Sequence, residues 1–177
     1  YGDTALYFAS KAGVNGHIYS YEFLHDNINI FNKNLKLNSE LGKRVDIIKY
    51  PLWSSSGKKL FIKENGPATI VSDYSKDPDA TQIETKCIDD LVQSKDLSRL
   101  NFIKMDIEGS ELEALKGAEK SIRKFKPKLA ISIYHKLKDF WEIPQWINNL
   151  DLDYSFYLKH VTIHCEETVL FAKIKDS

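Results

Sequence analysis

The sequence predicts an α/β fold built on a mostly parallel sheet. Short apolar runs alternate with segments whose apolar residues recur at helical spacing, the order typical of strand–helix units. The run at 128–134 is apolar almost throughout, as expected of a strand buried on both faces. The last two apolar runs, 154–159 and 168–174, are joined by a link too short for a helical crossover, so we expect an antiparallel pair.

The first third of the chain predicts two strand–helix units. We expect a helix over 3–12, a strand over 17–22, a helix over 26–37 capped by Asp26, and a strand over 45–50.

Between residues 54 and 88 the pattern changes. Three short candidate strands, at 60–62, 68–71 and 82–86, are separated by glycine and proline, which predicts a hairpin excursion from the sheet. A short helix at 89–92 follows, and a further helix is expected over 139–150, after the apolar run at 128–134.

The most informative segment is 101–119. A strand at 102–105 delivers Asp106 and Glu108 to its carboxyl end, and Ser110 opens a helix with Glu113 in a capping-box position. In extended chain Asp106 and Glu108 point the same way, and neighbouring carboxylates raise each other's pKa, which suits a general base. The alternative is that these acids only lie near a helix N-terminus, where negative charge interacts favourably with the helix dipole. The helix is expected to stop before Pro127 and to bury Leu112, Leu115, Ala118, Ile122 and Phe125.

His135 ends the apolar run at 128–134 and therefore opens onto the same sheet edge as Asp106. Ligands bind at the carboxyl ends of strands in open parallel sheets, so His135 is a candidate base or substrate ligand. A strand-end hydrogen-bonding group is the alternative. Lys104 is placed to pair with one of the two acids.

A second set of candidates lies at the ends of other elements. Glu22 ends a strand, where a carboxylate can accept both hydroxyls of a ribose, although it could also be a solvated acid. The helix that begins at Gly2, Asp3 and Thr4 offers amides to polar ligand groups. Phe23 and Leu52 follow strand ends and could flank an adenine ring or belong to the core, as could Trp53.

Composition excludes several classes of function. Lys plus Arg and Asp plus Glu are 25 each, so net charge gives no attraction to nucleic acid or an anionic membrane. No apolar run is long enough for a membrane span. Cys87 and Cys165 fit neither a disulfide framework nor a metal motif, which predicts reduced thiols in a cytoplasmic protein. His160, His164 and Cys165 fit no closed zinc pattern, so no metal is predicted.

Several segments together resemble one family, the FkbM-type S-adenosylmethionine-dependent methyltransferases, from about residue 2 to residue 173. The segments are Lys104-Met-Asp106-Ile-Glu108-Gly109-Ser-Glu111, Leu115-Lys-Gly117-Ala118-Glu119, Gly2-Asp-Thr4, Ile18-Tyr-Ser-Tyr-Glu22, Ile131-Ser-Ile-Tyr-His135 and Glu167-Thr-Val-Leu-Phe171. Gly2-Asp-Thr4 resembles the end of the family's glycine-rich loop, and Glu22 the acid that ends its second strand.

The resemblance implies a single domain over 1–177 with a Rossmann-like class I methyltransferase sheet. It implies S-adenosylmethionine as cofactor and a hydroxyl of a sugar, glycan or secondary metabolite as substrate. Asp106 would lie at the cofactor's amino or methyl end, with Glu108 or His135 as the base. The family's first strand and most of its glycine loop would precede Tyr1, so we expect further chain upstream, or another chain, to fill that central position.

Two other functions stay open at this point. One is a non-catalytic Rossmann-like module that binds a partner or nucleotide without turnover. The other is a nucleotide-binding enzyme of another class, which would need a Gly-x-Gly-x-x-Gly loop before the ribose acid. An oligomer is possible, because an unfilled central strand position invites pairing between chains.

Overall fold

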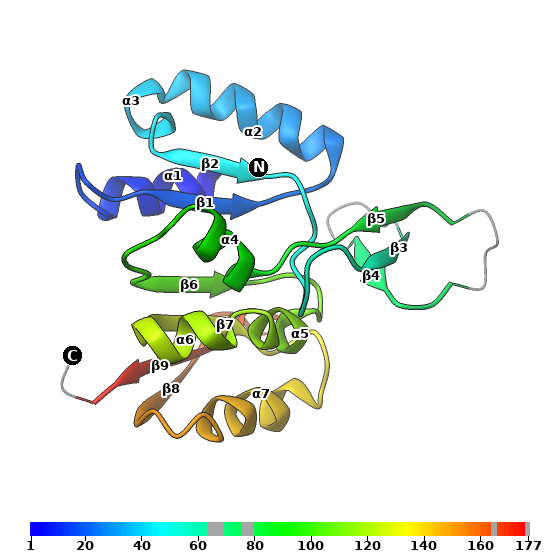
Figure 1. Ribbon diagram of the computed structural model, residues 1–177, viewed down its shortest axis with the longest axis vertical. Helices are drawn as coiled ribbons and strands as arrows, with labels where there is room; N and C mark the ends of the chain where they lie inside the picture. The colour runs from blue at the N-terminus through cyan, green and yellow to red at the C-terminus, as the bar shows by residue number, and fades with distance from the viewer. Residues whose placement is uncertain (64–68, 76–79, 164–165, 176–177) are drawn as a thin grey trace. The chain divides into compact units, whose positions relative to one another are not determined.

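The computed structural model describes residues 1–63, 69–75, 80–163 and 166–175. The chain forms two compact units, Tyr1–Pro51 and Leu52–Ser177, and each is described by itself (Figure 1). Both units contain helices and strands, as predicted for an α/β fold. The expectations that fall on residues 68, 164 and 165 lie outside the described residues.

The first unit packs three helices with two parallel strands. Its elements are α1 (Asp3–Lys11), β1 (Ile18–Tyr21), α2 (His25–Leu37), α3 (Ser39–Gly42) and β2 (Val45–Ile48). Ile18 of β1 lies opposite Val45 of β2 in the parallel ladder. Its core forms where the apolar sides of the elements meet, at Ala5, Ala9, Phe31 and Val45. The predicted helices and strands of this unit are confirmed, and α3 is an addition.

Asp26 does not cap α2, which corrects the sequence prediction. The helix begins one residue earlier, at His25, with Leu24 as its N-cap. The Asp26 side chain is 99% exposed and lies 3.8 Å from His25. The acid that binds the amides at this helix entry is Glu22, because the chain turns directly from the end of β1 into α2.

The predicted hairpin excursion is a small antiparallel sheet in the second unit. It consists of β3 (Lys59–Lys63), β4 (Ile70–Ser72) and β5 (Gln82–Glu84) in the order β4-β3-β5. Its two connections to the rest of the unit run side by side. Leu52 bridges Lys86, the Trp53 amide donates to the Lys86 carbonyl at 3.0 Å, and the Gly57 amide donates to the Thr85 carbonyl at 3.0 Å.

The main sheet of the second unit has the order β6-β7-β9-β8. Its strands are β6 (Phe102–Met105), β7 (Lys128–Ser132), β8 (Tyr154–His160) and β9 (Thr168–Ile174). β6 and β7 are parallel, with Met105 opposite Ile131, and β9 runs antiparallel to both β7 and β8. The predicted antiparallel ending is therefore confirmed. The parallel pair brings two strand carboxyl ends to one edge.

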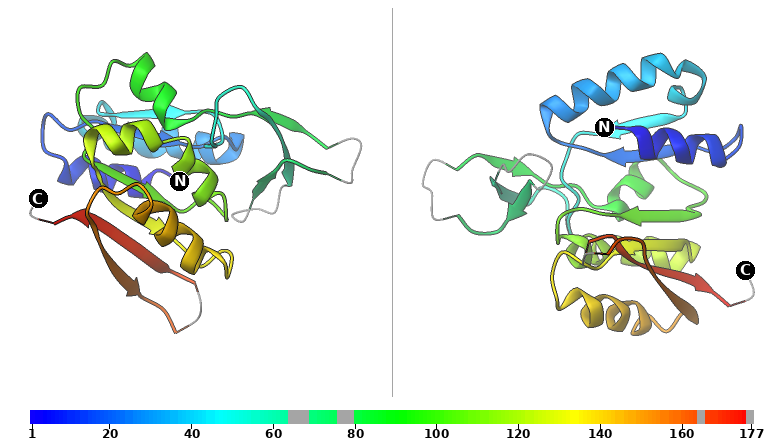
Figure 2. Two further views of the ribbon diagram at one scale, coloured as in Figure 1. Left: turned by 60° about the horizontal axis from the view of Figure 1, so that its bottom comes forward. Right: turned by 180° about the vertical axis from the view of Figure 1, so that it is seen from behind.

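Helices cover one face of this sheet. They are α4 (Ile88–Ser94), α5 (Glu111–Lys116), α6 (Glu119–Phe125) and α7 (Asp139–Asn148). α5 and α6 lie in front of the strands in Figure 1. In the rear view of Figure 2, β9 lies in front of these two helices. Within the described ranges, no helix has the length and apolar character needed to cross a membrane. Pro144 lies inside α7, further from its start than the expected first turn.

The helix predicted after Ser110 is two helices, and its capping box is wrong. Ser110 is the N-cap of α5 but makes no side-chain cap hydrogen bond, and Glu113 pairs instead with Lys116 one turn on. The break between α5 and α6 falls at Gly117, which packs against backbone. A Cβ there would lie 2.2 Å from the Trp53 carbonyl oxygen. Of the predicted core residues, Leu115, Ala118 and Ile122 are buried, whereas Leu112 and Phe125 are half-buried.

The second helix of this pair is capped from outside by Asp89, on α4. One Asp89 oxygen accepts the Ser121 amide at 2.8 Å and the Ser121 hydroxyl at 2.6 Å, and the other accepts the Lys120 amide at 3.1 Å. The Asp89 amide in turn donates to the Gly117 carbonyl at 2.9 Å. These bonds satisfy amides in the first turn of α6 that have no partner within the helix.

Replacing Gly2 should destabilise the first unit more than replacing Gly13. Both have left-handed φ, 89° and 72°, so alanine costs about 1–2 kcal/mol of backbone strain at either position. A Cβ on Gly2 would also lie 2.1 Å from the ring of Phe31, whereas nothing lies within 4 Å of one on Gly13. We expect Gly2→Ala to cost a further ~1–3 kcal/mol from overpacking. Urea unfolding measures both, and equal losses would contradict the packing argument.

Replacing Asp89 with alanine should lower the free energy of unfolding by about 1–2 kcal/mol, because the amides of Lys120 and Ser121 lose their acceptor. Glu119→Ala is the control. Glu119 is also an acid in the first turn of α6, but it is 43% exposed and pairs with Arg123 in the same helix. Its loss should cost less than ~0.5 kcal/mol. Chemical denaturation of the two variants side by side checks this, and similar losses would rule out the cap.

Candidate functional site

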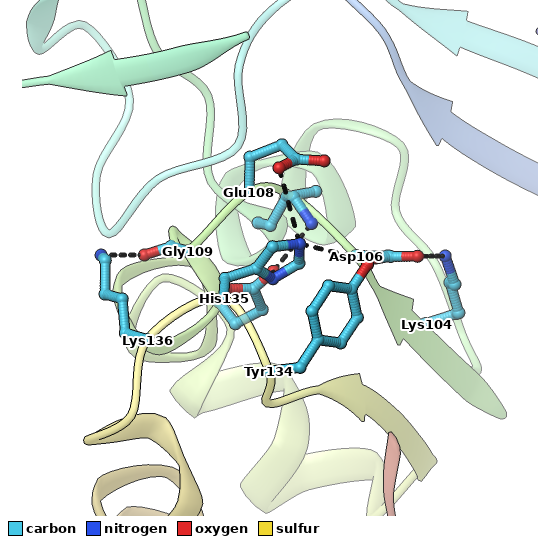
Figure 3. Close-up of polar contacts among 9 residues, drawn as sticks. Lys104, Asp106, Glu108, Gly109, Tyr134, His135 and Lys136 are labelled. Atoms are coloured by element: carbon cyan, nitrogen blue, oxygen red, sulfur yellow. Dashed lines mark hydrogen bonds and ion pairs between the residues drawn. The ribbon is translucent and has the colours of Figure 1, made fainter. Parts of the chain in front are cut away.

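A histidine surrounded by carboxylates lies at the carboxyl ends of β6 and β7 (Figure 3). The Nε2 atom of His135 lies 3.6 Å from an oxygen of Asp106 and 3.6 Å from an oxygen of Glu108. Its Nδ1 atom lies 3.1 Å from Glu111 Oε1. The three residues predicted to be catalytic are therefore brought together in the second unit, and Glu111 joins them.

The approach of these side chains follows from the local backbone. Met105 and Ile131 are opposite each other near the ends of β6 and β7, so the residues that follow them meet at one edge. Glu108 and Gly109 have φ of 56° and 86°, which turns the chain back toward α5. The predicted extended spacing of the two acids is thus wrong, because the strand ends at Met105. Both acids nevertheless face His135.

Asp106 is held by two donors from neighbouring strands. The Lys104 ammonium donates to Oδ2 at 3.0 Å, as the sequence suggested, and the Tyr134 hydroxyl donates to Oδ1 at 3.0 Å. Burial acts to raise the pKa of Asp106, but the charge and hydrogen bond of Lys104 and the bond from Tyr134 bring it below its ordinary value. The expected raised pKa is therefore wrong for Asp106. Burial and the Asp106 charge raise the pKa of Tyr134.

The pKa of His135 differs from the ordinary value of a histidine. Its side chain is only 9% exposed, and burial acts to lower the pKa. The contact with Glu111, together with the charges of Glu108 and Asp106, outweighs burial and raises the pKa of His135 above its ordinary value. The cluster therefore favours a positive charge at its centre.

Glu111 and Asp139 are site residues that sequence reasoning missed. Glu111, the first residue of α5, is fully buried, and its Oε1 atom accepts the Ile107 amide at 2.8 Å. Its position is three and four residues before the buried Ala114 and Leu115, so helical spacing was a signal that it faces inward. Asp139 is 2% exposed, and burial followed by the Glu111 charge raises its pKa.

The atoms of this cluster are close enough to hold a cation. Asp106, Glu111 and His135 each offer one ligand atom, and these atoms all lie within 4.8 Å of one another. A positively charged side chain lies beside the loop between β6 and α5, because the Lys136 ammonium donates to the Gly109 carbonyl. A side chain at Gly109 would meet Lys136, with a Cβ 2.8 Å from its Cε atom.

Glu22 in the first unit is half-buried, and three hydrogen bonds hold its carboxylate. Its Oε1 atom accepts the amides of Phe23 and Leu24 at 2.8 and 2.9 Å, and Oε2 accepts the Asn27 side-chain amide at 3.0 Å. The carboxylate is fixed where the chain leaves β1. Its predicted role toward a ribose stays a prediction.

The other predicted cofactor residues are divided between the two units. Gly2 is the N-cap of α1, and Asp3 and Thr4 form its exposed first turn, as expected of a helix that begins there. Phe23 is half-buried in the first unit, whereas Leu52 is 8% exposed in the core of the second. Trp53 is buried beside Leu52, so both fit the core alternative that the sequence left open.

Two solved structures are similar to this chain in fold. A crystal structure of methyltransferase FkbM from Methylobacillus flagellatus superimposes with a TM-score of 0.71 at 27% identity, over 94% of this chain and 40% of that one. The chain thus spans less than half of that protein's length. A Clostridium thermocellum protein proposed to be an rRNA-methylase has a TM-score of 0.56 at 14% identity, over 99% of this chain and 83% of that one, and shares the fold.

No curated protein matches the chain. The model of the methyltransferase FkbM domain matches residues 1–156, which include every residue of the histidine–carboxylate cluster. The sheet order of the second unit and the structural neighbours together show a class I methyltransferase fold. The chain belongs to the methyltransferase FkbM domain family.

Proposed function

We propose that the protein transfers a methyl group from S-adenosylmethionine to a hydroxyl of a sugar, a glycan or a secondary metabolite. The observation that carries the proposal is the histidine–carboxylate cluster at the carboxyl ends of β6 and β7. Membership of the methyltransferase family supplies the class of reaction. Methyl transfer from a sulfonium is an in-line displacement, so the protein has to orient the acceptor oxygen and remove its proton. The cofactor supplies the reactive methyl group.

Glu108 is the better candidate for the base. Its side chain is 33% exposed and can meet an incoming hydroxyl, whereas the His135 side chain is 9% exposed. His135 lies behind Glu108, with Nε2 3.6 Å from its carboxylate, and can hold that carboxylate in place. His135 as the base itself is the second possibility, and the two are separable by substitution.

Asp106 is suited to a charged neighbour rather than to proton transfer. Its lowered pKa keeps it ionised near neutral pH, and Lys104 and Tyr134 fix its orientation. An ionised, oriented carboxylate stabilises a positive group such as the amino group of the proposed cofactor.

Glu22 is the proposed ligand of the cofactor's ribose. A carboxylate offers about four acceptor sites, and three hydrogen bonds already reach Glu22. The amides of Phe23 and Leu24 orient the group, so only the Asn27 side chain has to move for two ribose hydroxyls to bind.

Exposed aromatic side chains support an acceptor with sugar-like faces. Tyr74 is 69% exposed, Phe140 is 40% exposed and Trp141 is 53% exposed, and all three lie in segments that follow strands of the second unit. Aromatic rings can pack against the apolar faces of sugars.

Replacing Glu22 with glutamine should weaken binding of S-adenosylhomocysteine to the full-length protein by about 10–100-fold, because a charged acceptor is lost. Glutamine keeps an oxygen for the Phe23 and Leu24 amides, so folding should survive. Asp26→Asn, the same charge change on a 99% exposed side chain, is the control and should leave affinity unchanged. Asn27→Ala should preserve or tighten binding. Calorimetric titration measures all three.

If the folded wild-type protein binds no S-adenosylhomocysteine, the non-catalytic module gains support. If it binds a dinucleotide instead, the nucleotide-binding enzyme of another class does. Circular dichroism on each variant separates loss of binding from loss of structure.

Replacing Glu108 with glutamine should lower kcat by about 10²–10⁴-fold with the affinity for S-adenosylhomocysteine unchanged. The assay follows labelled methyl transfer to a panel of sugar and polyol hydroxyls. Glu113→Gln is the matched control, because Glu113 is 34% exposed against 33% for Glu108 but pairs with Lys116 on α5. Full activity in Glu108→Gln, with loss in His135→Gln, would move the base to His135.

A further inference from the structure

We propose that Asp106, Glu111 and His135 bind one divalent transition-metal ion. The three residues come from the end of β6, the start of α5 and the end of β7, and their ligand atoms lie within 4.8 Å of one another. No metal was predicted from the sequence, in which His160, His164 and Cys165 fit no closed zinc pattern. His135 is distant in sequence from Asp106 and Glu111, and the pairing of β6 with β7 brings the three together.

The first argument is uncompensated charge in a buried place. Glu111 is fully buried, and its Oε2 atom has no hydrogen-bond partner among the described residues. Asp139 is 2% exposed, and its Oδ2 atom also has no hydrogen-bond partner among the described residues. A buried carboxylate is costly unless a cation or donors compensate it.

The two lysines beside the cluster balance only part of its charge. Lys104 binds the outer oxygen of Asp106, and Lys136 donates to the Gly109 carbonyl. Glu108 adds a further carboxylate 3.6 Å from His135. The cluster of Asp106, Glu108, Glu111 and Asp139 therefore holds more negative charge than these two lysines balance.

The second argument is the state of His135. Both ring nitrogens are buried, and neither makes a hydrogen bond of good geometry to the described residues. The separation of 3.6 Å between Nε2 and Asp106 Oδ1 is too long for a hydrogen bond. Two ligands that are each about 2.1 Å from a metal ion lie roughly 3–4 Å apart, so this separation suits an ion shared by Nε2 and Asp106. Glu111 lies beside the other ring nitrogen, Nδ1, and reaches the same ion only within the wider 4.8 Å spacing of the three ligand atoms.

The donor set indicates the kind of ion. One imidazole nitrogen with two carboxylate oxygens suits Mn²⁺, Fe²⁺ or Zn²⁺ better than Ca²⁺ or Mg²⁺, which prefer oxygen alone. Three protein ligands leave positions open for water or an acceptor hydroxyl, as in catalytic metal sites. An ion there would lower the pKa of a bound hydroxyl, and Glu108, outside the ligand set, could then take its proton.

The competing occupant is a proton. If His135 carries a second proton, the imidazolium compensates Glu111 and Asp106 without any metal. The two occupants differ in a measurable way, because only the metal brings the ring nitrogen into direct coordination.

The test uses the full-length protein stripped with a chelator and titrated with Mn²⁺, with free Mn²⁺ followed by electron paramagnetic resonance. We expect one site per chain, displaced by Zn²⁺, and nitrogen coupling to the bound Mn²⁺ in a pulsed experiment. Glu111→Gln and His135→Gln should each weaken binding by more than ~100-fold, and the second should abolish the nitrogen coupling. Glu142→Gln is the control, since Glu142 is a 34% exposed acid on α7 paired with Lys138.

Failure of the wild-type protein to bind Mn²⁺ or Zn²⁺ while folded would overturn the proposal and leave the proton as occupant. Binding without nitrogen coupling, or binding equally weakened by Glu142→Gln, would also overturn it. Neither cofactor nor acceptor is present in the titration. Its outcome is therefore independent of whether the protein transfers methyl groups.

Discussion

The buried contact between Glu111 and His135 is the interaction on which the second unit's chemistry depends. Glu111 starts α5, accepts the amide of Ile107 in the preceding loop, and lies 3.1 Å from the histidine that follows β7. One carboxylate thus connects a loop, a helix and a neighbouring strand. Because water cannot reach it, its charge has to be balanced by a group inside the protein. The positions of Asp106, Glu108 and His135 are consequently set by packing as much as by pairing with each other.

Two further carboxylates bind backbone amides near the start of a helix. Glu22 binds two amides between β1 and α2, and Asp89 binds two amides in the first turn of α6. Asp89 satisfies amides of α6 that have no partner within that helix, whereas Glu22 binds the two amides just before α2. An acid at a strand end in this protein therefore has a structural role even where it also has a chemical one.

The sequence predicted the order of elements well because apolar runs and helical spacing are local signals. The strand at 102–105 and the antiparallel ending at 154–174 were recognised from length and pattern alone. The break at Gly117 was not, since the Trp53 carbonyl that packs there is distant in sequence. The Ser110–Glu113 capping box failed because Lys116 offers Glu113 a charged partner one turn on.

The sequence predicted three of the residues that meet in the cluster, but not their pKa shifts or the part played by Glu111. Asp106, Glu108 and His135 were named from strand ends, and they do meet. Their pKa shifts could not be foreseen, because they depend on Lys104, Tyr134 and Glu111, whose distances follow from the strand pairing. The burial of Glu111 was not predicted, because an acid at the start of a helix is usually exposed.

Hydrogen bonds close the base of the hairpin excursion, where the chain leaves and re-enters the rest of the second unit, and they affect how the protein tolerates changes in length. The chain leaves through Ser55 and returns through Thr85, whose buried hydroxyl donates to the Ser55 carbonyl at 2.6 Å. The Gly57 amide and the Lys58 carbonyl also bond Thr85, so we expect that changes in length further along the excursion leave these closing bonds in place. The excursion is thus a segment whose outer part can differ in length while its base and the pairing of β6 with β7 stay the same.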